Sequence, residues 1–359
     1  MKLLTRYLAR ELYFSMALVF AALLMLFALL DLIGQLNEMG QGNYRLGYVL
    51  LYVALLLPGH VYELFPVAVL IGAIFGLVQL AANSELTVYR ASGVSLQQMI
   101  VALLTIGIPL VLLCLLFGEV LAPPSQHLAQ RMKLKAQNAE LSLREFRSGV
   151  WVKDGVSFIN VRNVTPEAEL LGISIYQFDE DYVLRAITVA DNAHFVRERE
   201  WLLQGVKRTL FTPQGGAQAE VRDRMAWRSS LNPNLFSVLL VAPEQMSALD
   251  LYRYTEHLAG NRQKTGRYEI ALWNKLAYPL AVWVMLLLAL PFSSYHRREG
   301  GIGGKVFLGI VLGLGFHFVG RLFANLGALN EWPAVVSATA MDWVFLGVAL
   351  WMLRRTERR

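Results

Sequence analysis

Six apolar runs, each close to the length that crosses a lipid bilayer as one helix, dominate this sequence. A helix needs about 20 apolar residues to span the hydrocarbon core. The runs cover residues 12–30, 61–81, 99–118, 276–292, 306–324 and 334–353. Because 55% of the residues are hydrophobic and only 17% are charged, a soluble domain of this length is excluded. The sequence therefore predicts an integral membrane protein with six transmembrane helices.

A seventh apolar run, residues 46–57, is too short to span a bilayer and stops at Pro58. We expect it either to lie at the membrane interface or to extend the second span outside the membrane. In both cases the number of crossings stays even.

Lys and Arg residues in short segments indicate the orientation, because cytoplasmic loops carry an excess of them. They gather in the N-terminal tail, after the fourth span and at the C-terminus: Lys2, Arg6, Arg10, Arg297, Arg298, Lys305, Arg354, Arg355, Arg358 and Arg359. The loop after the first span carries Arg45 alone, and the loop after the fifth carries no Lys or Arg. We therefore expect both termini and residues 83–95 to be cytoplasmic, and the β domain described next to be outside.

The segment between the third and fourth spans changes from a helical period to a strand period. Residues alternate on either side of Asp154-Gly155, which is typical of a β-hairpin. Further short strand candidates follow at 171–179, 184–196, 200–211 and 219–229, and helical stretches flank them at 123–143 and 243–260. This spacing predicts a β-sandwich or jelly roll over about 140–245.

The predicted fold class is an α-helical membrane protein with six transmembrane helices, three plus three, and an inserted extracytoplasmic β-jellyroll domain. Residues 1–121 form the first transmembrane half, and residues 266–359 form the second. Residues 122–265 form the segment between them.

No catalytic or metal-binding constellation stands out. The glycine-rich stretch 299–307 fails the phosphate-loop pattern at both ends, because Glu299 occupies the first glycine position and Val306 follows Lys305. The histidines are scattered, and the single cysteine, Cys114, lies inside the third span. We therefore expect no catalytic residue, no metal and no cofactor in this chain, and an energy source that lies elsewhere.

Ionisable residues at or inside the spans are costly in lipid and usually face a cavity or a partner. Asp31, Glu119 and Arg321 lie at the outer ends of spans, where interfacial anchoring explains them as well as a functional role does. Asp342 lies well inside the sixth span and is expected to face protein. Basic residues just outside the membrane, either solvated or meeting an anionic ligand, are Arg131, Lys133, Lys135, Arg262, Lys264 and Arg267.

The stretch "NSELTVYRASGVS", residues 83–95, predicts a short cytoplasmic helix. Asn83 or Ser84 can cap it, Glu85 favours its positive end, and Ser92-Gly93 stops it. A helix of two turns is not stable alone, so it must dock on something. It docks either on this protein's own cytoplasmic face or on a cytoplasmic partner, which could be an ATPase because the chain has no nucleotide site.

Five stretches, in order along the whole chain, resemble the LptF/LptG family of lipopolysaccharide export permeases. They are "GQGNY" (40–44), "SELTVYRASG" (84–93), "WVKDG" (151–155), "LGISIYQF" (171–178) and "GRYEIALWNKLAYPL" (266–280). The stretches "GISIYQF" and "GRYEIALW" favour the LptG branch of the family.

The resemblance implies a permease subunit of an ABC-type transporter in the bacterial inner membrane, with a periplasmic β domain. Its implied partners are the paired permease LptF, the ATPase dimer LptB, which binds the ATP and Mg, and LptC. The implied substrate is lipopolysaccharide, extracted from the membrane and passed to a periplasmic bridge. The implied coupling helix is 84–93, and its ATPase-contacting residues are Ser84, Glu85, Leu86, Tyr89 and Arg90.

The sequence departs from the family near the outer end of the first span, where lysines that meet sugar phosphates are replaced by Asp31, Asn37 and Glu38. The candidate phosphate contacts are therefore Arg131, Lys133, Lys135 and Arg321, or a divalent cation held by Asp31 or Glu38. Two other classes stay open: an ion-coupled secondary transporter that uses Asp342, and a membrane scaffold that does not transport.

Overall fold

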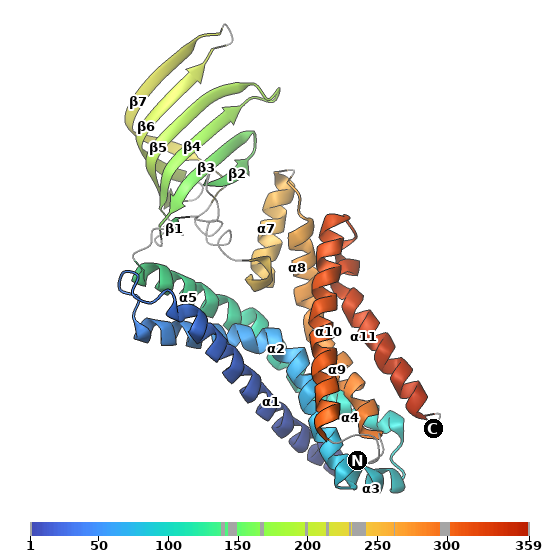
Figure 1. Cartoon of the computed structure of the whole chain (residues 1–359). Helices are drawn as coiled ribbons and strands as arrows, with labels where there is room; N and C mark the ends of the chain where they lie inside the picture. The colour runs from blue at the N-terminus through green and yellow to red at the C-terminus, as the bar shows by residue number, and fades with distance from the viewer. Residues whose placement is uncertain are drawn as a thin grey trace.

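The structure is a computed structural model that describes residues 2–137, 141–142, 149–165, 169–197, 200–212, 215–229, 231, 242–261, 263–294 and 302–357. Among these residues, six helices are long and apolar enough to cross a membrane, and an antiparallel sheet is inserted between the third and the fourth. The predicted fold class is confirmed. Figure 1 shows the sheet beyond one end of the helices, with α3 and both chain ends at the opposite end.

The first two spans form an antiparallel helical hairpin. Helix α1 covers Lys2–Leu36 and helix α2 covers Leu46–Ala82. Helix α2 continues through Pro58 without a break, so the short apolar run 46–57 is an extension of the second span. Of the two arrangements expected for this run, the structure shows the second.

Glycines four residues apart let α1 and α2 approach closely. Gly72 and Gly76 of α2 face α1, as in the small-residue spacing that brings membrane helices together. A Cβ atom at Gly72 would lie 2.5 Å from the Cα atom and 2.9 Å from the backbone nitrogen of Met16. The two helices therefore pack backbone against backbone at this level.

The third span is one continuous helical segment that changes its period. It consists of α4 (Leu96–Leu115), the π-helical turn η1 (Leu116–Leu121) and α5 (Ala122–Ala136). Pro123 and Pro124 lack the N–H groups that regular α-helical bonding would use, so the backbone widens just before them. We predicted a helix to residue 143; the described helix ends at Ala136, and residues 138–140 and 143–148 lie outside the described residues.

The inserted domain is one curved antiparallel sheet (Figure 1). Its strands are β1 (Leu141–Ser142), β2 (Val150–Asp154), β3 (Ser157–Val164), β4 (Leu170–Phe178), β5 (Leu184–Arg197), β6 (Glu200–Phe211) and β7 (Ala217–Arg228). From β3 to β7, neighbours in the chain are neighbours in the sheet, and β1 and β2 both pair with β3. Residues 143–148 and 232–241, which belong to the range predicted as a jelly roll, lie outside the described residues.

The hairpin turn between β2 and β3 lies one residue later than the Asp154-Gly155 pair predicted. Asp154 still pairs with Ser157, so the two-residue loop is Gly155-Val156. Gly155 has a φ of 61°, whereas the φ of Val156 is not positive. This is the pattern of a type II′ turn, whose first central residue is glycine. The glycine therefore sets the position of the turn.

Two helices lead from the sheet to the apolar part of the fourth span. They are α7 (Ala248–Gly260) and α8 (Gly266–Ala277), and the fourth span continues through η3 (Tyr278–Leu280), α9 (Ala281–Ala289) and η4 (Leu290–Ser294). The last two spans are α10 (Ile302–Leu329) and α11 (Ala334–Glu357). The core around α9 brings together residues from both halves, including Leu77, Phe316 and Phe345.

Candidate functional site

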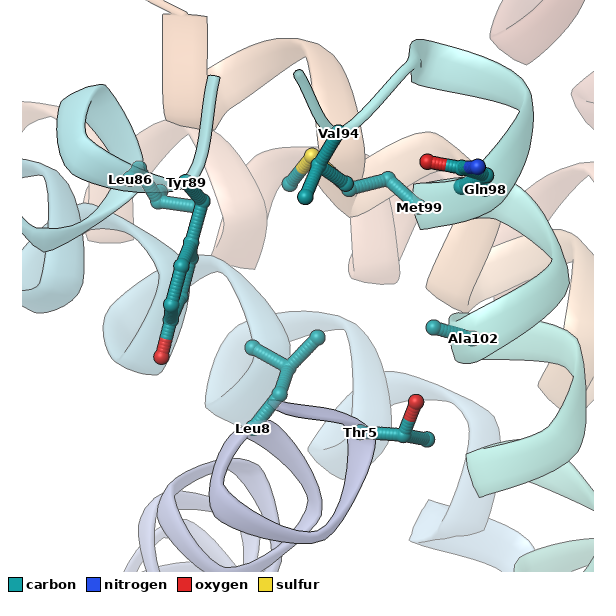
Figure 2. A pocket seen from close by; sticks show the side chains of 8 residues that line it. All are labelled: Thr5, Leu8, Leu86, Tyr89, Val94, Gln98, Met99 and Ala102. Atoms are coloured by element: carbon teal, nitrogen blue, oxygen red, sulfur yellow. The ribbon is translucent and has the colours of Figure 1, made fainter. Parts of the chain in front are cut away.

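The predicted short helix exists as α3, Glu85–Ala91, and two of its side chains seat it on the bundle. Leu86 is only 5% exposed, and Tyr89 is partly buried. Figure 2 shows both side chains pointing into the same small space as Leu8 of α1 and Met99 of α4. This space is a cavity of about 30 Å³, so α3 touches the first and third spans together.

Backbone geometry fixes both ends of α3. At its start Ser84 has a φ of 64°, and its carbonyl accepts a hydrogen bond from the Val88 N–H at 3.1 Å. At its end Gly93 has a φ of 83°, and the Val94 N–H donates to the Tyr89 carbonyl at 3.2 Å, which is the bonding of a Schellman motif. The predicted stop at Ser92-Gly93 is confirmed. At the start, where Asn83 or Ser84 was predicted as the cap, the backbone carbonyl of Ser84 accepts the hydrogen bond.

The outward face of α3 differs from the set of residues predicted to contact a partner. Leu86 and Tyr89 point inward, and the Glu85 carboxylate is half-buried and accepts a hydrogen bond from the Tyr7 hydroxyl. The Arg90 side chain lies outside the described residues. The exposed residues are Ser84, Thr87, Val88 and Ala91. Their spacing of three and four residues is that of one helical face, and that periodicity in the sequence could have grouped them on one face.

Lys133 and Glu38, two of the predicted phosphate contacts, meet each other at the end of the helices nearest the sheet (Figure 1). The Lys133 Nζ atom lies 2.7 Å from Glu38 Oε2, and Gln137 donates to the same oxygen at 2.9 Å. Burial acts to raise the pKa of Glu38, but the hydrogen bonds from Lys133 and Gln137 outweigh it and hold that pKa below its usual value. The pair joins the loop after α1 to the end of α5.

The other predicted phosphate contacts form separate groups. Asp31 pairs with His60 of α2 at 2.5 Å, and Arg321 lies 3.4 Å from Glu63 of α2 with 79% of its side chain exposed. Arg131 and Lys135 of α5 are exposed, on the same helix as Lys133. Thus α5 gathers three of the predicted cations, while Arg321 lies on α10.

A buried ion pair that the sequence analysis did not predict joins the third span to the segment before the fourth. Lys275 of α8 is 7% exposed, and its Nζ atom lies 3.7 Å from Glu119 Oε1 of η1. The other Glu119 oxygen accepts the Ala248 N–H at the start of α7 at 2.9 Å, and Lys275 also donates to the Met246 carbonyl. The available sequence signal for this pair was Lys275, a lysine directly before the fourth apolar run. For Glu119, interfacial anchoring explained its place in the sequence as well as a functional role did.

Asp342 of α11 is half-buried, and its Oδ1 atom is buried without a hydrogen-bond partner among the described residues. The sequence pattern that singled it out, a carboxylate inside an apolar span, therefore corresponds to a partly buried polar group. Such groups are costly and often functional.

These features define a multi-span membrane protein in which one β domain is inserted between two halves of three spanning helices. The chain belongs to the LptF/LptG family, described as lipopolysaccharide export system permease LptF/LptG, whose family model matches residues 6–355. It is 33% identical over 316 residues to the lipopolysaccharide export system permease protein LptG of Escherichia coli strain K12, which covers 88% of each chain. The protein of the same name from Haemophilus influenzae is 29% identical over 316 residues, again with 88% of each chain covered.

Proposed function

We propose that this chain is the permease subunit of an ABC-type transporter that extracts lipopolysaccharide from the bacterial inner membrane. Its family and the names of its relatives support the substrate and the membrane. The positive-inside pattern supports cytoplasmic termini and a periplasmic β domain. The paired permease is LptF, and LptC receives the lipid from the β domain.

The observation that carries the ATPase partnership is the seating of α3. Its two inward side chains, Leu86 and Tyr89, are anchored, and its outward face offers the exposed apolar side chain Val88. A short rigid helix of this kind suits a groove on a second protein. The partner, an LptB dimer, would hold the ATP and Mg²⁺. Closure of that dimer would act through α3 and shift the populations of the conformations of the transmembrane helices.

Replacing Val88 by arginine should weaken the binding of the ATPase by at least about tenfold, because it puts a charge into a contact that must lose its water. Val88 is 60% exposed, so the substitution leaves the seat of α3 intact. The measurement is copurification of the ATPase with the permease pair. Val221→Arg is the matched control, since Val221 is exposed on β7 of the sheet. Full retention of the ATPase by Val88→Arg would refute the coupling role.

The exposed cations of α5 are the proposed contacts for the lipopolysaccharide phosphates. Arg131 takes part in no ion pair among the described residues, and guanidinium groups bind phosphate oxygens bidentately. Lys133 is already held by Glu38, so Arg131 is the better placed of the two to meet a substrate.

We expect Arg131→Glu to weaken lipopolysaccharide binding by about tenfold, because it removes a charge-assisted hydrogen bond and adds repulsion. Binding would be measured by titrating lipopolysaccharide into the purified complex. Arg253→Glu, at an exposed position of α7, is the matched control. Equal affinity of the two variants and the unchanged protein would remove Arg131 from the contact set.

A secondary transporter is the second candidate, favoured by the Oδ1 atom of Asp342 in the last span, which has no hydrogen-bond partner in the part of the chain that the structure describes. Transport by such a protein would continue without an ATPase and would follow a proton gradient. Reconstituted vesicles with ATP and without a gradient, and the reverse, separate the two candidates.

A further inference from the structure

A groove of about 730 Å³ runs between α1 and α4 beside the seat of α3. One wall comes from α1, through Arg6, Ala9 and Tyr13. The other comes from α4, through Gln97 and Ala102 among others. The groove lies at the end of the helices opposite the sheet, because it is formed by the first turns of α1 and α4 next to α3 (Figure 1).

The two ends of this groove differ in polarity. Arg6 and Gln97 line it near the helix starts, and Ala9, Val101 and Ile106 line it further in. The hydroxyl groups in the deeper part are already used. Tyr13 donates to the Ile106 carbonyl at 2.8 Å, and Thr105 donates to the Val101 carbonyl at 2.8 Å. The deeper part therefore offers a ligand mainly hydrocarbon.

The polar end carries the cationic side chain of Arg6. Arg6 is exposed and has no hydrogen-bond or ion-pair partner among the described residues. An arginine side chain stays charged at all physiological pH values and matches phosphate geometry. From Gln97 to Ile106 an α-helix rises about 14 Å, close to half of a hydrocarbon core of about 30 Å. A groove of this length, with a cation at one end and apolar walls further in, matches the phosphate and the acyl chain of a phospholipid.

We propose that this groove binds one anionic glycerophospholipid, with its phosphate on Arg6 and an acyl chain along Ala9, Val101 and Ala102. The assignment of this lipid to the cytoplasmic leaflet rests on the orientation in the proposed function. The choice of an anionic phospholipid rests on Arg6 and the apolar groove and does not depend on that orientation. Ala102 also lines the cavity behind Leu86 and Tyr89 (Figure 2). A bound lipid would therefore hold α1 and α4 at a fixed separation beside α3.

The test uses photoactivatable phosphatidylglycerol and phosphatidylcholine, each with a diazirine on the acyl chain, in nanodiscs that hold the purified complex. We expect crosslinks on the α4 peptide that contains Val101 and Ala102, about fivefold stronger for phosphatidylglycerol, since one surface cation favours an anionic lipid by about that factor. Arg6→Gln should remove the preference. Ala102→Trp should fill the groove and remove the crosslink. Arg10→Gln, one turn along α1 and outside the groove, should change neither.

Equal crosslinking of the two lipids, or a preference that survives Arg6→Gln, would mean ordinary annular lipid and overturn the proposal. Lipid crosslinks on a neighbouring subunit, with none on the α4 peptide, would also overturn it and make the groove a subunit interface. Thermal unfolding of each variant identifies any that fails to fold, and Arg6→Gln, an exposed change, then decides the result. The readout is lipid contact, so it is independent of the Val88→Arg result, which tests the proposed function.

Discussion

Glu119→Gln should lower the free energy of unfolding by about 3 kcal/mol, because it leaves a buried ammonium group without its counter-charge. The Lys275 side chain is 5% exposed, and that of Glu119 is 31% exposed, so the lower end of the range for buried pairs applies. Glutamine keeps an oxygen that can accept the Ala248 N–H, which isolates the charge. The measurement is unfolding of the detergent-solubilised protein by heat and by denaturant.

A second substitution makes the cause testable. When Lys275→Met is added to Glu119→Gln, the buried charge disappears, and most of the lost stability should return, since hydrophobic replacement of a buried pair is often neutral. A double variant as unstable as the sum of the two single variants would show that the residues act independently.

Gly72→Ala should also destabilise the protein strongly, by about 3 kcal/mol, because the added methyl group meets the backbone of Met16, which no rotamer change can move. To bring this 2.5 Å contact to an ordinary distance of at least 3.4 Å, the packed helices would have to separate by about 0.9 Å. The measurement is again thermal unfolding in detergent, together with the protease sensitivity of the loop between α1 and α2.

Gly347→Ala provides the matched control in another spanning helix. Apart from the neighbouring backbone of its own helix, no heavy atom of the described residues lies within 4 Å of a Cβ placed at Gly347, so alanine should be neutral or stabilise the helix by up to about 1 kcal/mol. Equal behaviour of the two glycine variants would mean that α1 and α2 do not pack closely in the membrane.

The sequence predicted the features that depend on local patterns. Apolar length gave the six spans, alternation gave the strands, and Ser92-Gly93 gave the end of α3. The turn after β2 was misplaced by one residue because Asp-Gly is a favourable dipeptide, but the strand pairing places Gly155 first.

The sequence did not predict the side-chain pairs whose members are distant in the chain. Glu119 and Lys275 are separated by the whole inserted domain, so no spacing rule joins them. The Lys133–Glu38 pair likewise joins residues that are distant in the chain, and in it two of the expected substrate contacts bind each other. For α3, the inward and outward faces follow from where α1 and α4 lie, which local pattern alone does not show.

The unbroken path from α4 through η1 to α5 has a mechanical consequence. Residues 96–136 form one helical segment of 41 residues, with the seat of α3 at one end and the base of the sheet at the other. Such a segment is about 60 Å long, so a tilt of about 5° at the α3 end displaces the far end by up to about 5 Å. The third span can thus act as a lever that magnifies a small movement at one membrane surface into a large one beyond the other.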